Sequence, residues 1–340
     1  MPPVRIGFIG CGTHATQNLY PSLRYADCEL VAVADLYEER REHCKRAFGA
    51  ARAYDDGERL LDAETDLDAV MVCGPAEVHH RFALAALERG LPVFTDKPPA
   101  RTLDAAIEIR DAARAAGQPC MVGLMKRFAQ KHVAARRLTE ADEFGGLTHL
   151  LLRYSWSSGA PRASKRSAAE RLHGTLTGMC IHAIDLATHF LGPVERVQVA
   201  RGGPGEGVLN LAVNLLAATG ATGTVIVSNS AAVVTERLEL TGRNAHLVVD
   251  ELAELSYYPP AEETWQPPFI VVRRPNFPLQ TRENCSLHLQ GYAGEVCEFV
   301  DAVRENRPPS AATIGDAVYT MRLLDAIERT PFGHAEIESD

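Results

Sequence analysis

A glycine-rich sequence near the start of the chain constrains the fold more than any other feature. The residues from Gly10 to Ala15 read G-x-G-x-x-A and directly follow a short apolar run, Arg5–Ile9. After a strand, the first glycine permits a tight turn, the second lets the backbone approach a pyrophosphate, and the third position needs only a small residue. The N-terminus of the next helix attracts phosphates. This context predicts a dinucleotide site at Gly10, Gly12, Thr13, His14 and Ala15.

The first 122 residues alternate between short apolar runs and helical stretches. The runs Leu30–Ala34 and Ala69–Cys73 alternate with helical segments such as Glu38–Phe48 and Val78–Arg89. The runs are apolar throughout, as is typical of parallel strands that are covered on both faces. This succession predicts an α/β protein with an N-terminal Rossmann domain, that is, a doubly wound parallel sheet.

After about residue 123 the pattern changes. Helices are expected over Ala129–Leu138 and near Ile181–Leu191, and strand candidates then follow one another from Val194 to Leu255 without helices between them. Such a series predicts a large open sheet of mixed or antiparallel strands. We therefore expect a nucleotide-binding domain over residues 1–122 and an α/β domain for substrate binding and oligomerisation over 123–340. The C-terminal helices are able to pack back on the first domain.

An acidic residue at the end of the second predicted strand indicates the cofactor. Asp35 lies 23 residues beyond Gly12, where a carboxylate accepts hydrogen bonds from ribose hydroxyls. Its charge would repel the additional phosphate of NADP, and the two residues after it bring no cation. Arg40 and Arg41 are close enough in sequence to leave NADP open. We expect NAD, with NADP as the alternative.

Charge and composition exclude several classes of protein. The net charge of −9 argues against nucleic acid as a partner, because phosphate binding needs a basic surface. The first apolar run is too short to span a membrane and lacks the features of a signal peptide. The eight cysteines include no C-x-x-C pair and are interpreted as reduced thiols. We therefore expect a cytoplasmic protein with no membrane partner.

Motifs around the fourth and fifth predicted strands are more specific. The segment Val72–His79 ends one strand, and Thr95-Asp96-Lys97-Pro98 follows the next. Together with the segment Val122–Phe128 and the helix Gly178–Leu186, they resemble the glucose–fructose oxidoreductase/inositol dehydrogenase (Gfo/Idh/MocA) family. The C-terminal pattern is also similar, with Tyr292, Glu295 and Phe299. The resemblance covers nearly the whole chain and is weakest from about residue 195 to 286.

The resemblance implies an enzyme that oxidises a pyranose, a cyclitol or a related polyol at a secondary alcohol. It implies a C-terminal open sheet that makes the oligomer contact, so that a homodimer or homotetramer is expected. An uncovered sheet face independently favours a homo-oligomer. The resemblance also places four further residues at the cofactor pocket: Gly74, Pro75, His79 and Asp96.

Two residues are candidates for proton transfer. Lys97 follows a predicted strand at its carboxyl end, where open α/β sheets bind ligands, and it is also expected to contact the cofactor. Desolvation near a positively charged nicotinamide would lower its pKa, whereas outside this motif such a lysine is usually a solvated charge. The family places its catalytic histidine at the position of His182. The alternative for His182 is a half-buried histidine with a structural partner.

The sequence departs from the family pattern at Gly178, where the family has an aspartate one helical turn before the histidine. That carboxylate would orient the ring and stabilise its cation. Its loss leaves three possibilities open: a shifted chemistry, a mechanism led by Lys97, or reduced activity. Asp185 either replaces this aspartate as the partner of His182 or has a structural role in stabilising the helix.

Substrate contacts are expected from the segment after the sixth strand, from the loop Ser157–His173 and its flank, and from the helix of His182. These candidates are Lys126, Arg127, Trp156, Arg162 and Asp185. Cations of the loop either are solvated or bind an anionic substrate. No metal is expected, because the spacing of His182, Asp185 and His189 arises from helix packing alone.

Two other functions remain open on the same scaffold. Some members of the family keep NAD bound and use transient oxidation to drive elimination or glycoside cleavage. The replacement of the aspartate by Gly178 also leaves open a regulatory protein that binds NAD without turnover. The first and main expectation remains hydride transfer between nicotinamide and a sugar-like or cyclitol-like alcohol or ketone.

Overall fold

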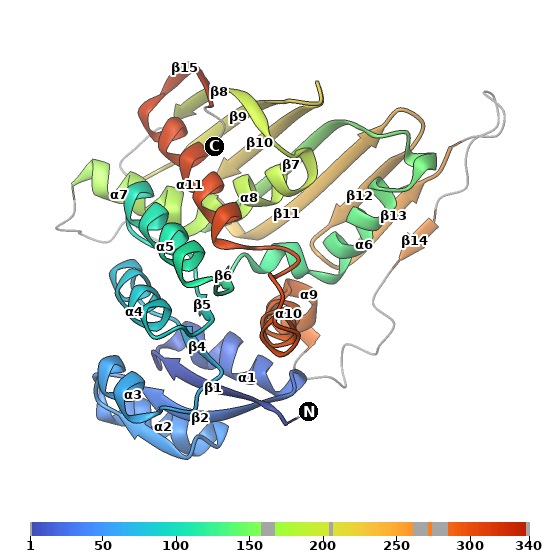
Figure 1. The fold of residues 1–340 in the computed structure, drawn as a ribbon. Helices are drawn as coiled ribbons and strands as arrows, with labels where there is room; N and C mark the ends of the chain where they lie inside the picture. Colours follow the sequence, from blue (N-terminus) through green and yellow to red (C-terminus); the bar gives the residue numbers. More distant parts are fainter. Residues whose placement is uncertain (1, 158–166, 204–206, 261–270, 274–284, 338–340) are drawn as a thin grey trace. The chain divides into compact units, whose positions relative to one another are not determined.

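The computed structural model describes residues 2–157, 167–203, 207–260, 271–273 and 285–337. The chain divides into two compact units, each formed by two segments (Figure 1). The first unit comprises Met1–Phe128 and Gly291–Tyr319, and the second comprises Ala129–Gln290 and Thr320–Asp340.

The first unit contains a six-stranded parallel sheet in the order β3-β2-β1-β4-β5-β6. Its strands are β1 (Val4–Ile9), β2 (Cys28–Ala34), β3 (Arg52–Tyr54), β4 (Ala69–Val72), β5 (Val93–Thr95) and β6 (Cys120–Val122). The central strands are buried at nearly every position, as the apolar runs predict. The strand order reverses between β1 and β4, and the carboxyl ends of these strands are where such sheets bind ligands. The predicted doubly wound Rossmann sheet is confirmed.

The helices of this unit begin and end at sequence signals. They are η1 (Ala15–Leu19), α1 (Tyr20–Ser22), η2 (Leu23–Tyr25), α2 (Glu38–Phe48), α3 (Gly57–Ala63), α4 (Ala76–Glu88), α5 (Leu103–Ala116), η3 (Met125–Phe128) and α10 (Tyr292–Arg304). Thr102 caps α5 by accepting a hydrogen bond from the N–H of Ala105, and Gly117 ends it in the left-handed conformation. Although α10 is distant in sequence, it packs in this unit, where the Phe299 ring lies 5.7 Å from the Phe94 ring on β5.

The second unit contains a nine-stranded mixed sheet in the order β14-β13-β12-β11-β7-β10-β9-β8-β15. Its strands are β7 (Leu147–Ser157), β8 (Val194–Gly202), β9 (Asn210–Ala217), β10 (Thr222–Ser228), β11 (Ser230–Gly242), β12 (His246–Asp250), β13 (Glu254–Tyr258), β14 (Val271–Arg273) and β15 (Phe332–Glu336). All neighbouring pairs are antiparallel except β7 and β10. The predicted large mixed sheet is therefore confirmed.

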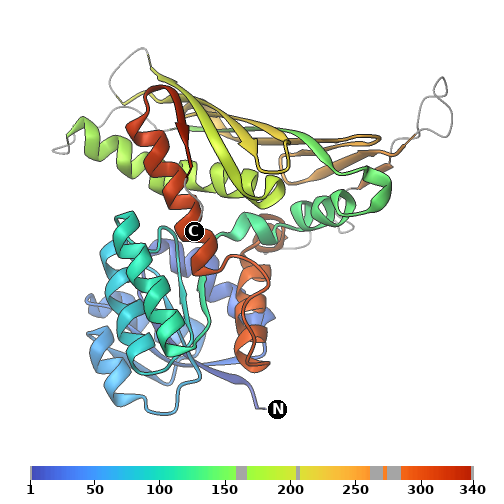
Figure 2. The ribbon, with the colours of Figure 1, turned by 45° about the horizontal axis from the view of Figure 1, so that its top comes forward.

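The helices of the second unit lie on one face of this sheet (Figure 2). They are α6 (Gln130–Thr139), η4 (Asp142–Phe144), α7 (Ala168–Thr175), η5 (Leu176–Cys180), α8 (Ile181–Leu191) and α9 (Cys285–Gln290), together with the later part of α11 (Ile314–Arg329). Helix α8 packs on β7 and β10, and a Cβ at Gly223 of β10 would lie 2.6 Å from Leu191 of α8. Strand residues alternate between buried and exposed, so one sheet face contacts the helices and the other is exposed.

Candidate active site

The glycine-rich turn joins β1 to η1 in the predicted manner. Gly10 has a φ of +107°, and a Cβ there would lie 1.9 Å from the carbonyl oxygen of Cys73, so only glycine fits. In contrast, no heavy atom of the described residues lies within 4 Å of a Cβ at Gly12. The open space at Gly12 and the absence of a side-chain cap on η1 among the described residues fit a bound pyrophosphate. Ala15 is fully buried, as close packing at this position requires.

Asp35 lies directly beside this turn at the end of β2. Its Oδ2 accepts a hydrogen bond from the N–H of Cys11 (2.8 Å), and its Oδ1 accepts one from the N–H of Tyr37 (2.9 Å). The carboxylate is thus fixed by the backbone at the edge of the predicted dinucleotide site. The guanidinium of Arg40 stacks 4.5 Å over the Tyr37 ring, and Arg41 donates to the carbonyl oxygen of Asp35 (3.4 Å).

A buried histidine connects the two motifs that follow β4 and β5. The N–H of Gly74 donates to Nε2 of His79 (2.8 Å), and Nδ1 of His79 lies 2.7 Å from the carbonyl oxygen of Pro98. Because Nε2 accepts, Nδ1 carries the proton and donates to Pro98. Burial lowers the pKa of His79, which keeps the ring neutral. His79 therefore holds the backbone on one side of Lys97, and the Lys97–Pro98 peptide bond is cis.

Asp96 is buried at the carboxyl end of β5. Its Oδ2 lies 3.5 Å from Nε2 of His14 and 4.0 Å from Sγ of Cys73. The amide of Asn18 donates to Nδ1 of His14 (3.2 Å), so the Nε2 proton of this ring points at Asp96. The structure thus brings together the predicted residues His14, Asp96 and Lys97 with the glycine turn at one end of the sheet.

In the second unit, His182 lies in the first turn of α8 and is buried. Its ring is edge-on to the Tyr154 ring at 6.5 Å, and Tyr154 packs against the predicted residue Trp156 at 5.6 Å. Burial raises the pKa of Tyr154 above its usual range. One turn after His182, Asp185 is buried and accepts a hydrogen bond from Oγ1 of Thr320 (3.1 Å).

Gly178 lies in η5, a π-helical turn directly before α8. Within the described part of the chain, no heavy atom comes within 4 Å of a Cβ placed on it. The position therefore has room for a side chain that this sequence does not supply. Single π-helical turns are frequent at functional sites. Nothing in the residue types of Leu176–Cys180 indicated this turn in advance.

Lys126 and Arg127 are both buried in η3. Nη1 of Arg127 lies 3.0 Å from Oδ1 of Asp316, so this guanidinium has an ion-pair partner within its own unit. Burial opposes the ionisation of Asp316, but Arg127 and hydrogen bonds from Thr313 outweigh it and lower its pKa. Arg162, the remaining predicted substrate contact, lies outside the described residues.

Besides Glu64, which pairs with Arg52, two buried carboxyl groups were not predicted as site residues. Glu236 of β11 pairs with His132 of α6, with 3.1 Å between Oε1 and Nε2, and it lies directly opposite Tyr154 across the strand pair. Glu295 is fully buried on α10. A glutamate on the apolar face of a helix, between Tyr292 and Phe299, is the sequence signal that could have identified it.

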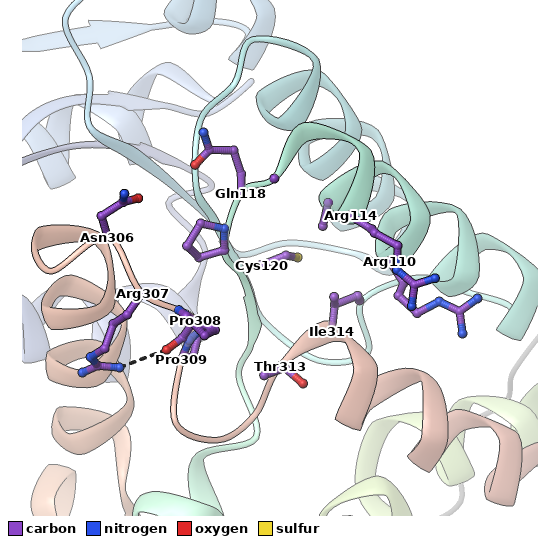
Figure 3. A pocket seen from close by; sticks show the side chains of 13 residues that line it. Arg110, Arg114, Gln118, Cys120, Asn306, Arg307, Pro308, Pro309, Thr313 and Ile314 are labelled. Atoms are coloured by element: carbon purple, nitrogen blue, oxygen red, sulfur yellow. Dashed lines mark hydrogen bonds between the residues drawn. The ribbon is translucent and has the colours of Figure 1, made fainter. Parts of the chain in front are cut away.

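A hollow of about 370 Å³ lies elsewhere in the first unit, at the amino end of β6 (Figure 3). Arg110 and Arg114 reach it from α5, and Thr313 and Ile314 come from the other side. It lies at the opposite end of the strand from the ligand-binding edge. The described residues contain no cluster of three metal-ligating side chains, and none of their helices has the length and apolar character needed to cross a bilayer.

Comparison with known proteins identifies the scaffold. Residues 4–124 match the model of an oxidoreductase family with an NAD-binding Rossmann fold, and residues 132–248 match the Gfo/Idh/MocA C-terminal domain. The chain belongs to the Gfo/Idh/MocA family. The resemblance inferred from the motifs is thereby confirmed.

Curated relatives are sugar and cyclitol dehydrogenases. Inositol 2-dehydrogenase 2 of Saccharopolyspora erythraea is 31% identical over 193 residues, which are 56% of this chain and 54% of the relative. D-glucoside 3-dehydrogenase of Escherichia coli is 32% identical over 193 residues, with the same coverage of 56% and 54%. The matched part therefore spans about half the length of these relatives. A dehydrogenase structure from Chromobacterium violaceum has a TM-score of 0.86 and 27% identity, covering 96% of this chain and 95% of that one.

Proposed function

We propose that this Gfo/Idh/MocA protein transfers hydride between NAD and a secondary alcohol or ketone of a sugar-like or cyclitol-like substrate. The observation that carries the proposal is the arrangement at the carboxyl ends of β1, β4 and β5. There an open glycine turn, a backbone-fixed Asp35 and the His79-supported segment of Lys97 meet at one end of a parallel sheet. The names of the curated relatives support this class of substrate.

The cofactor is assigned to the first unit. When bound, NAD would supply the hydride acceptor. The N–H groups at the N-terminus of η1, after Gly12 and Thr13, are expected to bind its phosphates, and Asp35 is expected to accept from a ribose hydroxyl. The segment Gly74–Pro75 is expected to line the same pocket. The negative charge of Asp35 favours NAD over NADP.

Proton transfer is assigned to Lys97 and His182. Oxidation of an alcohol requires a group that takes the hydroxyl proton as hydride leaves the carbon. The hydrogen bond from His79 to the carbonyl oxygen of Pro98 restricts the backbone next to Lys97. This restriction helps to position the ε-amino group of Lys97. His182 supplies an imidazole on a buried helix in the second unit. Lys126, Arg127, Trp156, Arg162 and Asp185 are assigned to substrate contact or to support of the site.

The proposal is tested by a spectrophotometric screen for NADH formation and consumption. Purified protein is offered sugars, cyclitols, sugar acids and their keto forms, with NAD(H) and NADP(H) in parallel. Wild type is compared with Lys97→Ala and with Lys45→Ala, a control substitution on α2. We expect turnover with one substrate class that is lost in Lys97→Ala and retained in Lys45→Ala.

Other outcomes distinguish the alternative functions. NAD that stays bound and returns to its starting redox state during product formation would indicate elimination or glycoside cleavage. Tight NAD binding without turnover of any substrate would contradict the dehydrogenase and favour a regulatory role. A homo-oligomer, which we also propose, is tested by light scattering of the same preparation.

A further inference from the structure

One ionisable side chain in the first unit has no role in the function proposed above. Glu295 lies in the first turn of α10 and has an exposed fraction of 0%. Neither of its carboxyl oxygens has a hydrogen-bond partner among the described residues. An ionised carboxylate without partners is very costly in such a place, whereas a protonated one is far less so.

The packing of α10 places Glu295 beside the carboxyl end of β5. Three residues earlier on the helix, the Tyr292 ring contacts the His14 ring at 5.6 Å, and four residues later Phe299 contacts Phe94. These residues share one helical face, because residues three and four apart are neighbours. Phe94 and Asp96 are two positions apart along an extended segment and therefore point to the same side of the sheet. Glu295 and Asp96 thus belong to the same buried corner.

The electrostatics of the corner oppose two negative charges. Burial raises the pKa of Glu295 well above its usual range, the charge of Asp96 raises it further, and the charge of Lys97 acts in the opposite direction. Two carboxyl groups in one buried site do not both ionise readily. Asp96 retains contacts with His14 and Cys73, whereas Glu295 has none of this kind. The proton therefore belongs on Glu295.

Other titratable groups near α10 do not change this balance. Those on the elements that pack against it, or next to them, include Arg5, His14, Tyr20, Arg24, Tyr25, Cys73, Lys126 and Arg127. Arg5 is paired with Glu29 and Asp66, and burial raises the pKa of Tyr20, so that its hydroxyl stays neutral. Burial raises the pKa of the Cys73 thiol, so it stays neutral. Arg127 is paired with Asp316, and the backbone carbonyl of Tyr25 accepts from Cys297 at a later turn of α10. The charges that influence Glu295 are instead those of Asp96 and Lys97.

We propose that Glu295 is a positioning residue that carries a proton at neutral pH, so that Lys97 faces one negative charge, on Asp96, instead of two. A second carboxylate would stabilise the ammonium form of Lys97. An ammonium group cannot accept the substrate proton. The neutral Glu295 thus keeps Lys97 able to act as a base. This consequence rests on the proposed function, but the protonation of Glu295 does not.

The first test is an infrared spectrum of the cofactor-free protein at neutral pH. A protonated carboxyl group gives a carbonyl band that a carboxylate lacks. We expect this band in wild type and its loss in Glu295→Gln. The matched control is Glu64→Gln, because Glu64 is also buried but is ionised in a pair with Arg52 and a 2.7 Å hydrogen bond from Tyr54. This substitution should leave the band in place. A wild-type spectrum without the band would overturn the proposal.

The second test is the pH dependence of unfolding. Above the ordinary pKa of a glutamate, about 4.3, the native state holds one proton more than the unfolded state. The unfolding equilibrium constant of wild type should therefore rise about tenfold per pH unit relative to Glu295→Gln. Relative to Glu64→Gln, the constant of wild type should instead be independent of pH above about 4.3 and should rise as the pH falls below it, because Arg52 lowers the pKa of Glu64. If Glu295→Gln instead destabilises the protein equally at all pH values, Glu295 is a structural residue only. Glu295→Leu repeats the comparison if the glutamine variant does not fold.

The third test concerns Lys97. In wild type, the ionisation of Glu295 adds a charge beside Lys97, and the kcat/KM profile should change at the pH where this ionisation occurs. The event should be absent from Glu295→Gln, and a purely structural role would leave both profiles alike. If no substrate is turned over, the proposed function fails, while the infrared band and the unfolding data still decide the protonation of Glu295.

Discussion

A Cβ at residue 123 would lie 2.7 Å from Oδ1 of Asp96, so Gly123 provides the space that this carboxylate occupies. The same Cβ would lie 3.2 Å from the Cα of Asp96 and 3.3 Å from the Phe94 ring. The side of the sheet on which Asp96 lies, directly after β5, is therefore closed by the segment after β6. The position of Asp96 depends on a glycine that is distant from it in sequence.

We expect Gly123→Ala to displace Asp96 and to destabilise the first unit by about 1–3 kcal/mol, as overpacking does. NAD affinity should fall with it, because the Asp96–Lys97 segment moves. Thermal unfolding and NAD titration measure the two effects. Gly202→Ala is the control, since no described heavy atom lies within 4 Å of a Cβ there. Equal stability and equal NAD affinity of the two variants would show that the Asp96–Lys97 segment adjusts to the added methyl group without loss of stability.

The two glycines of the turn should respond differently to alanine. At Gly10, a positive φ and a 1.9 Å approach to Cys73 predict a loss of folding stability. At Gly12, the open surroundings predict a folded protein of nearly normal stability that has lost NAD affinity, because a methyl group occupies the place of the pyrophosphate. Calorimetry and NAD titration of both variants separate these effects. Undiminished NAD binding by Gly12→Ala would refute the assigned pyrophosphate position.

Gly178→Asp restores a carboxylate one helical turn before His182. The open space around this position predicts that the variant folds. A nearby negative charge raises the pKa of an imidazole, so the limb of the kcat/KM profile that belongs to His182 should move to higher pH. Gly178→Asn is the matched neutral control and should leave that limb unmoved. An identical profile for both variants would indicate that residue 178 does not act on His182.

The cofactor preference should respond to Asp35. Replacing it by serine removes the charge that repels an additional phosphate, while Arg40 and Arg41 remain nearby. We expect Asp35→Ser to shift the ratio of NADP to NAD affinity by at least about tenfold, or about 1.4 kcal/mol. Titration with both cofactors measures this ratio. Asp55→Ser, a change on an exposed residue that pairs with Arg59, should leave it unaltered.

Acid stability should depend on Glu298. Burial alone would raise the pKa of Glu298, but hydrogen bonds from Arg307 and the N–H of Ser310 lower it. Because the native pKa is below the unfolded value, this contribution is present at neutral pH and is lost as the pH falls below about 4.3. Glu298→Gln should therefore be less stable than wild type at neutral pH and should approach it in acid. A constant difference across this range would contradict the assignment.

Apolar runs and helical spacing in the sequence predicted most of the strands and helices. The strand before Gly10 and the helix Tyr292–Arg304 follow directly from apolar runs and helical spacing. Strand β15 did not, because Phe332–Glu336 is largely exposed and forms by pairing with β8. The π-helical turn at Leu176–Cys180 likewise has no residue signature.

The residues of the candidate site that belong to a sequence motif could be predicted. The contacts that depend on tertiary packing could not. The glycine turn, Asp35 and Lys97 could be identified from residue types and spacing. The orientation of His79, which accepts from Gly74 and donates to Pro98, depends on where two separate loops meet. The environment of Glu295 depends on a helix that begins at Tyr292, 164 residues after Phe128, where the first segment of this unit ends.

The division of the first unit into two segments also affects the order of synthesis. The ribosome completes β1 to β6 early, but the helix that supplies Glu295 and Phe299 emerges only after eight of the nine strands of the other sheet. The apolar surface of β5 that Phe299 covers is therefore incomplete in the nascent chain until residues 291–319 have been made. A truncated transcript that ends before this helix would yield a nucleotide-binding unit with an unfinished core.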